Sequence, residues 1–136
     1  MSRRIAREYL FKMVFETLFV EPSETTSYED FLKNEELDEE NKNFVKDNFS
    51  SILKNKEELM DILKSTLTDN FSIDRIFKVD MAILLVALNE IKYYKQTPVK
   101  VVVNEAIDIS KKYSTEKSYS FINGVLAKYI KDNNIE

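Results

Sequence analysis

The sequence is informative first through the residues it lacks. It contains no cysteine, no histidine and a single glycine in 136 residues. Without cysteine there is no disulfide framework, zinc–thiolate site or thiol nucleophile, and without histidine there is no imidazole base for a Ser-His-Asp triad. One glycine also excludes Walker and dinucleotide-binding loops, because these loops need more. We therefore expect a binding protein and not an enzyme, with no cofactor and no metal.

Long apolar runs and targeting segments are also missing. The longest apolar run, residues 81–88, has eight members, whereas a membrane span needs about 20. Arg3 and Arg4 precede an apolar stretch, as in a signal peptide, but Lys12 and Glu16 interrupt that stretch and no small-residue cleavage site follows. We expect one domain over residues 1–136 in the cytoplasm, without membrane contact.

Charge is unevenly distributed along the chain. The net charge of −4 divides into +3 for residues 1–12, −10 for 13–90 and +3 for 91–136. If the two ends pack side by side, they would form one basic face on an acidic body, which is the electrostatic footprint of a nucleic-acid-binding protein. The alternative is a chance distribution of charge over solvated helix faces.

Scarcity of glycine and proline argues against an all-β fold, which needs frequent tight turns. Helical spacing of apolar residues predicts helices throughout. The first ends before Pro22, and Asp38 caps a later one that bends near Asn55. The predicted helices cover 2–20, 28–33 with Ser27 as cap, 38–67, 73–94 with Ser72 as cap, 98–113 after the start signal Thr97-Pro98, and 115–131.

Two segments favour β-structure locally. Residues 99–103 include four β-branched valines, and Asn123-Gly124 is a strong hairpin signal. No partner sheet is visible elsewhere, and the apolar stripe around Gly124 has helical spacing. Since glycine inside a helix costs roughly 1 kcal/mol relative to alanine, we expect Gly124 to mark close helix packing.

The first candidate binding cluster is a group of arginines at the chain start, Arg3, Arg4 and Arg7. Guanidinium groups bind phosphates bidentately, and cations near a helix N-terminus oppose the macrodipole, which suggests another purpose for them. We expect their joint replacement by alanine to weaken RNA binding and leave thermal stability nearly unchanged. The alternative is a solvated helix start.

The second cluster mixes lysines, hydroxyls and rings at the junction of the last two helices. Single-stranded RNA is held by such a mixture, with cations on phosphates, rings on bases and hydroxyls on base edges. The alternative is a polar loop between the helices with Tyr113 and Phe121 in the core, whereas Tyr119 lies off the apolar stripe. The candidate RNA-binding residues are Lys111, Lys112, Lys117, Tyr119, Ser120 and Phe121.

A third polar set flanks the buried run, namely Asp80, Asn89 and Glu90, with Asn104 and Glu105 in the next helix. Paired carboxylates can perform acid–base chemistry. Without histidine, a metal-ligand set or a phosphate loop, capping and hydrogen bonds between helices are the favoured roles.

Four segments together resemble one family. Residues 99–113 (VKVVVNEAIDISKKY) are similar to P-x-K-V-A-I-N-E-A-I-E-L-A-K, and 118–126 (SYSFINGVL) to S-x-x-F-V-N-G-V-L. Residues 80–90 (DMAILLVALNE) resemble D-R-A-I-L-R-L-A-L-Y-E, and 3–8 (RRIARE) resemble R-R-x-A-R-E. Order and spacing match the NusB family of transcription antitermination factors. Met81 and Leu85 replace two usual arginines, and Asn89 replaces a tyrosine.

The resemblance implies an all-α fold of two packed three-helix bundles without catalysis. It further implies pairing with the ribosomal protein NusE, binding of single-stranded boxA RNA in nascent ribosomal RNA, and read-through by an RNA polymerase antitermination complex. We expect both basic ends to face the RNA and the acidic middle to face NusE. A helical adaptor without RNA affinity remains the alternative, and both a monomer and a homodimer are open. A methyltransferase fusion is not expected, because no glycine-rich cofactor loop is present.

Overall fold

The computed structural model describes residues 2–20, 31, 33, 37–67 and 72–135, and within them every regular element is helical. The expected helix over 28–33, its cap Ser27 and the stop at Pro22 lie largely outside these residues. The elements are α1 (Ser2–Thr17), α3 (Glu39–Thr66), a 3₁₀ turn η2 (Ile73–Arg75), α4 (Lys78–Asn89), a π-helical turn η3 (Glu90–Tyr94), α5 (Val99–Tyr113) and α6 (Glu116–Asp132).

The long helix α3 begins and bends where the sequence indicates. The Asp38 carboxylate accepts a hydrogen bond from the backbone N–H of Asn41, as an N-cap does. Near its middle the backbone of Asn55 leaves helical geometry, with φ −107° and ψ 15°. The Asn55 amide donates to the Ser51 carbonyl oxygen at 2.9 Å, and such side-chain bonds compete with the backbone ladder. The predicted bend is confirmed.

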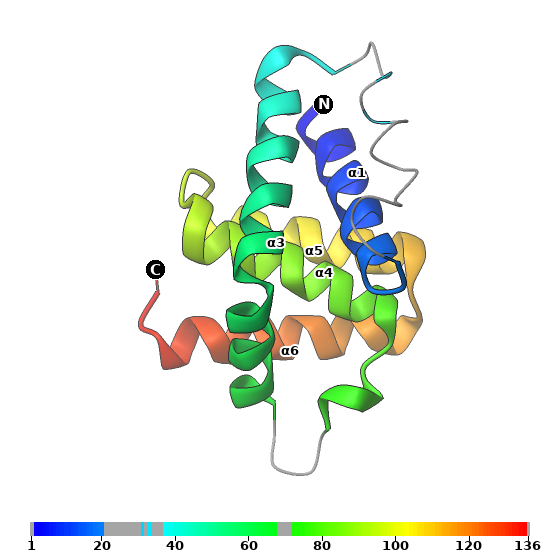
Figure 1. Ribbon diagram of the computed structural model, residues 1–136. Coiled ribbons are helices and arrows are strands. Elements are labelled where there is room, and N and C mark those ends of the chain that lie inside the picture. Colours follow the sequence, from blue (N-terminus) through cyan, green and yellow to red (C-terminus); the bar gives the residue numbers. More distant parts are fainter. Residues whose placement is uncertain (1, 21–30, 32, 34–36, 68–71, 136) are drawn as a thin grey trace.

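The central helix α4 lies between two pairs of helices. Its side chains from Asp80 to Asn89 are all buried, as expected for a helix that is apolar on every side. In Figure 1, α1 lies above α4, α6 lies below it, and α3 passes in front of it. The contacts form two groups of three helices that share α4, namely α1–α3–α4 and α4–α5–α6. The buried apolar side chains form one continuous cluster.

The entry to α4 differs from the sequence expectation of one helix over 73–94. Ser72 caps only the short η2 turn, and the backbone is extended at Ile76 and at Phe77 before α4 begins at Lys78. Ile76 is 5% exposed and Phe77 is 60% exposed. The break places Ile76 in the core and Phe77 in solvent. The break has no glycine or proline signal in the sequence. It accompanies the packing of Ile76 into the core.

Two buried polar side chains of α4, and the buried Glu90 directly after it, bond to neighbouring parts of the fold. The carboxylate of Asp80 accepts hydrogen bonds from the α5–α6 connection, and the amide of Asn89 bonds to α3. The carboxylate of Glu90, at the end of α4, accepts two bonds from Arg7 of α1. The favoured reading of this polar set, hydrogen bonding between helices, is confirmed.

Both segments with local β-signals are helical. Residues 99–103 open α5, and Asn123 and Gly124 lie inside α6. The start signal of α5 is shifted by one position, because Pro98 occupies the cap position and no side chain caps the helix. Helical periodicity over a whole segment therefore outweighs a dipeptide turn signal and local valine content.

Candidate RNA interface

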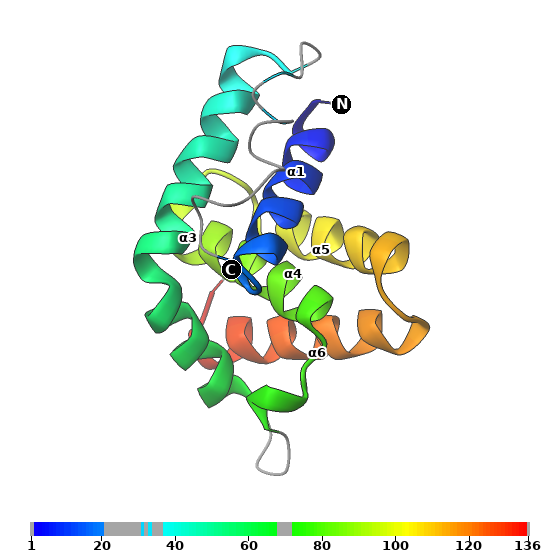
Figure 2. The same cartoon turned by 45° about the vertical axis from the view of Figure 1, so that its right-hand side comes forward.

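The connection between α5 and α6 consists of two residues. Basic side chains lie on the helices on either side of it. Ser114 ends α5 and Thr115 precedes α6. Lys111 and Lys112 occupy the last turn of α5, where cations also favour the helix macrodipole. Lys117 lies in the first turn of α6. We call Lys111 to Phe121 the α5–α6 turn; Figure 2 shows it at the right-hand edge of the molecule.

Aromatic and hydroxyl groups of the α5–α6 turn are accessible. Tyr119 is 44% exposed, and the Lys111 ammonium lies 5.6 Å from the centroid of its ring. Ser120 is exposed and Phe121 is half-buried. A ring with a cation beside it can stack on a base while the cation meets a phosphate. The structure therefore brings the predicted group of lysines, ring and hydroxyl together.

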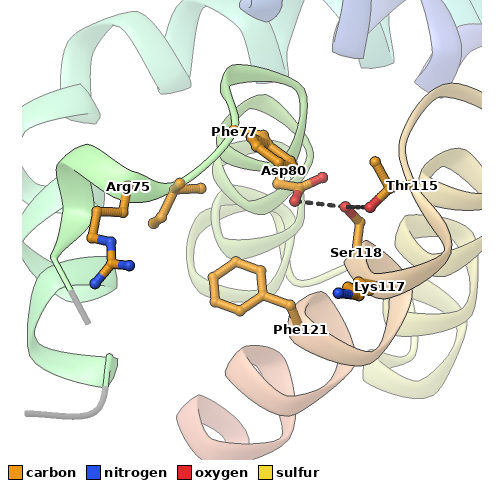
Figure 3. Close-up of a pocket in the computed structure, with 8 residues that line it drawn as sticks. Arg75, Phe77, Asp80, Thr115, Lys117, Ser118 and Phe121 are labelled. Atoms are coloured by element: carbon orange, nitrogen blue, oxygen red, sulfur yellow. Dashed lines mark hydrogen bonds between the residues drawn. The ribbon is translucent and has the colours of Figure 1, made fainter. Parts of the chain in front are cut away.

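Two hollows meet at Phe121. The first, about 190 Å³, lies between α6 and the start of α4 and is lined by Arg75, Phe77, Asp80, Lys117 and Phe121 among others (Figure 3). The second, about 290 Å³, is lined by Ser120, Phe121, Gly124 and Lys128 together with Thr66, Leu67 and Val125. Cations at the margins and an aromatic wall suit a base with its phosphate.

Gly124 corrects one expectation and explains the second hollow. A side-chain Cβ at this position would meet nothing within 4 Å. The expectation that Gly124 allows close helix packing is therefore wrong, because no described neighbour approaches it. The missing side chain leaves the surface of α6 open beside Phe121.

Arg75 and Lys128 line the two hollows but are not among the binding residues predicted from the sequence. Lys128 could have been found, because Lys117, Phe121, Gly124 and Lys128 follow one helical stripe at i, i+4, i+7 and i+11. Arg75 had no such signal, because the η2 turn brings it to the hollow from a different part of the chain.

The N-terminal arginines differ in their surroundings. The Arg3 Nε donates to the Asn41 side-chain oxygen at 2.6 Å, and its guanidinium lies 4.2 Å from the Phe44 ring centroid. Arg4 is exposed but donates to the carboxylates of Glu105 at 3.3 Å and Asp108 at 3.1 Å. Both arginines therefore already have partners within the fold.

Arg7 does not lie on the surface. It is 4% exposed, and its guanidinium donates to both carboxylate oxygens of Glu90, at 3.1 and 2.6 Å. Removing one partner of a buried pair leaves an uncompensated charge in the interior. This buried position disagrees with the expectation that Arg7 acts only through surface charge. It also disagrees with the expectation that loss of Arg7 leaves thermal stability nearly unchanged. RNA contact by Arg7 has no support from its location.

Lys112 is likewise held by a carboxylate. Its ammonium lies 2.6 Å from a Glu8 oxygen, which also accepts from the Tyr113 hydroxyl at 2.9 Å. Burial raises the pKa of Glu8, but the hydrogen bonds from Lys112 and Tyr113 outweigh it, so the pKa lies below its ordinary value. The same hydrogen bond raises the pKa of Lys112.

The two basic ends do meet, as the charge pattern suggests. Side chains of α1 bond to α5 through Arg4 and Glu8. However, the carboxylates of Glu8, Glu105 and Asp108 neutralise much of the charge there. Lys111 and Lys117 are exposed, and neither forms an ion pair with the described residues. A phosphate can therefore contact Lys111 and Lys117 of the α5–α6 turn without displacing a carboxylate.

No group of three or more acidic side chains in the described part of the chain could hold a metal ion. No helix among the described residues is long and apolar enough to cross a bilayer.

Comparison with known proteins gives matches over nearly the full length of the chain. The NusB family model matches residues 2–131. The transcription antitermination protein NusB of Finegoldia magna is 34% identical over 131 residues, covering 96% of this chain and 95% of that protein. The protein of the same name from Fusobacterium nucleatum is 38% identical over 135 residues, covering 91% and 85%.

Solved structures agree with the sequence relatives. A structure of T. maritima NusB superimposes with a TM-score of 0.83 at 29% identity, covering 96% of this chain and 91% of that one. A crystal structure of the antitermination factors NusB and NusE in complex with double-stranded RNA gives a TM-score of 0.83 at 25% identity, covering 96% and 97%. The all-α fold inferred from the resemblance is confirmed by these neighbours.

Proposed function

The chain belongs to the NusB family, and from this premise we propose that it is a transcription antitermination factor. It binds boxA RNA of nascent ribosomal transcripts together with NusE, and it acts within an RNA polymerase antitermination complex in the cytoplasm. It binds and performs no catalysis. The observation that carries the proposal is the match with curated antitermination proteins over nearly the full length of both chains.

The α5–α6 turn supports RNA binding on physical grounds. Lys111 and Lys117 offer charge that no described carboxylate holds, and Tyr119 offers an exposed ring beside them. Phosphate contacts of this kind supply affinity without sequence information. The ring and the Ser120 hydroxyl are the groups that can distinguish bases. Arg3, Arg4 and Lys112 add weaker contacts, because each must first leave its present partner.

NusE is proposed to bind within the acidic segment 13–90. This segment exposes acidic side chains along α3, among them Asp47, Glu57 and Asp61, and ribosomal proteins as a class are basic. It also exposes two aromatic side chains, Phe19 at 61% and Phe77 at 60%. Buried aromatic anchors dominate many protein interfaces. Because Phe77 also lines the first hollow beside Lys117, NusE would adjoin the RNA on this surface.

Titration of boxA RNA with and without NusE tests the proposal. We expect salt-dependent binding of boxA that NusE strengthens, and weaker binding of a scrambled strand of equal length. Charge steers association and sets specificity more than it sets affinity. NusE binding without any RNA affinity, in either titration, would instead indicate the helical adaptor. Size-exclusion analysis of the same samples distinguishes a monomer from a homodimer.

A further inference from the structure

Asp80 is a buried carboxylate that joins α4 to both helices of the RNA-binding turn. It is 3% exposed. The Ser114 hydroxyl donates to one carboxylate oxygen at 2.6 Å. The Ser118 hydroxyl donates to the other at 2.8 Å (Figure 3). Thr115 Oγ1 lies 2.9 Å from Ser118 Oγ, so this hydroxyl completes the network. One side chain therefore bonds to the residue that ends α5 and to the first turn of α6.

From this geometry we infer that Asp80 is a positioning residue for RNA binding, because it sets how α6 is placed relative to α5. The inference rests on the proposed function. Ser114 follows the lysines of α5, and Ser118 lies between Lys117 and Tyr119. Only Ser114 and Thr115 separate the two helices. A change in their relative orientation would therefore separate Lys111 from the ring of Tyr119, which now lie 5.6 Å apart.

Asp80 acts through the serines and not as an RNA ligand. Its two oxygens are occupied by hydroxyl donors, and a carboxylate would repel a phosphate. Removing its charge alone should thus favour RNA binding, since the net field near the RNA becomes more positive. Removing its hydrogen bonds should disfavour binding, because the lysines and the ring lose their arrangement. The two effects have opposite signs, which makes the inference testable.

The same helix offers a matched control. Asn89 is fully buried, and like Asp80 it bonds to a neighbouring helix, accepting from Ser51 at 2.8 Å and donating to Asn48 at 2.9 Å. Its partners belong to α3 and not to the α5–α6 turn. Loss of either side chain should lower stability, but only loss of Asp80 should affect the RNA-binding side chains.

The experiment is a titration of boxA RNA with full-length wild type, Asp80→Ala, Asp80→Asn and Asn89→Ala, each at a temperature where circular dichroism shows it folded. We expect Asp80→Ala to bind about two- to thirtyfold more weakly, the range that coupling through such networks spans. Asp80→Asn should bind at least as tightly as wild type, because it loses the negative charge while its amide can accept from one serine and donate to the other. Asn89→Ala should lose stability and keep its RNA affinity.

Two outcomes would overturn the inference. The first is wild-type or tighter RNA binding by Asp80→Ala, and the second is an equal loss of RNA affinity in Asp80→Ala and Asn89→Ala. If Asp80→Ala does not fold, the double variant Ser114→Ala and Ser118→Ala replaces it with the same expectation. If wild type binds no RNA, the proposed function fails, and amide resonances then decide the inference. They should shift at Lys111 and Tyr119 in Asp80→Ala and not in Asn89→Ala.

Discussion

The cations of α1 and those of the α5–α6 turn carry the same charge but have different neighbours. Arg4 is bonded to two carboxylates, and Arg7 is buried against a third. Lys111 and Lys117 are exposed without an acidic partner among the described residues. An exposed ion pair contributes little to stability, but a phosphate must displace its carboxylate before it can bind the cation. A basic cluster in a sequence is therefore not the same as free positive charge on a surface.

The ion pairs between α1 and α5 run in both directions. Glu8 of α1 pairs with Lys112 of α5, and Glu105 and Asp108 of α5 pair with Arg4 of α1. These pairs join α1 to α5 and occupy the cations between them. Three substitutions test whether the paired and the unpaired cations behave differently.

The largest effect is expected for Arg7→Ala. It leaves the Glu90 carboxylate buried without its partner, and breaking a buried pair costs about 3–5 kcal/mol. The exposed Arg4→Ala should cost no more than about 1 kcal/mol. Urea denaturation of both variants measures the difference. Equal midpoints would mean that Arg7 belongs with the surface cations after all.

A smaller effect is expected for Tyr119→Ala, measured as RNA affinity. Stacking of one base is worth about 1–3 kcal/mol, and the loss should be greater for boxA than for a scrambled strand. Tyr119→Phe keeps the ring and serves as the control. If both variants weaken both strands equally, the ring does not contribute to base discrimination. Phe121 is less suitable as a probe, because it is half-buried and its loss can unfold α6.

The smallest effect is expected for Asp108→Asn, and it has the opposite sign. Freeing Arg4 from one carboxylate should raise RNA affinity by an amount on the order of 0.2–1 kcal/mol, the value of an exposed ion pair. Asp61→Asn removes the same charge from the exposed surface of α3 and should change the affinity less. Fluorescence anisotropy with a labelled boxA strand can resolve the two. A decrease for Asp108→Asn would show that this pair supports the RNA surface.

Local features of the fold could be predicted from sequence, because their causes are local. The Asp38 side chain caps α3 by accepting from a backbone N–H three residues later. The bend at Asn55 is accompanied by a hydrogen bond to the carbonyl oxygen four residues earlier. The apolar run of α4 predicts burial on all sides. The break at Ile76 could not be predicted, since it depends on which side chain the rest of the core accepts.

The site was predictable in composition and not in electrostatics. The lysines, Tyr119 and Ser120 lie within ten residues of one another and do form one exposed turn. The partners of Arg4 and Arg7 are separated from them by 83 to 104 residues, so only tertiary structure reveals that these charges are paired. Gly124 shows the same limit, because a sequence indicates that glycine is present but not whether a neighbour approaches it.

We propose that RNA contacts the cations of the α5–α6 turn that have no acidic partner. Two lysines on either side of its connection test it most directly, because Lys117 lacks an acidic partner among the described residues while Lys112 is bonded to Glu8. For single strands each phosphate contact contributes about −0.7 to the slope of log affinity against log salt. We predict that Lys117→Ala reduces the steepness of this slope by about 0.7 and that Lys112→Ala reduces it by clearly less. An equal change for both lysines, or a larger one for Lys112→Ala, would contradict the account.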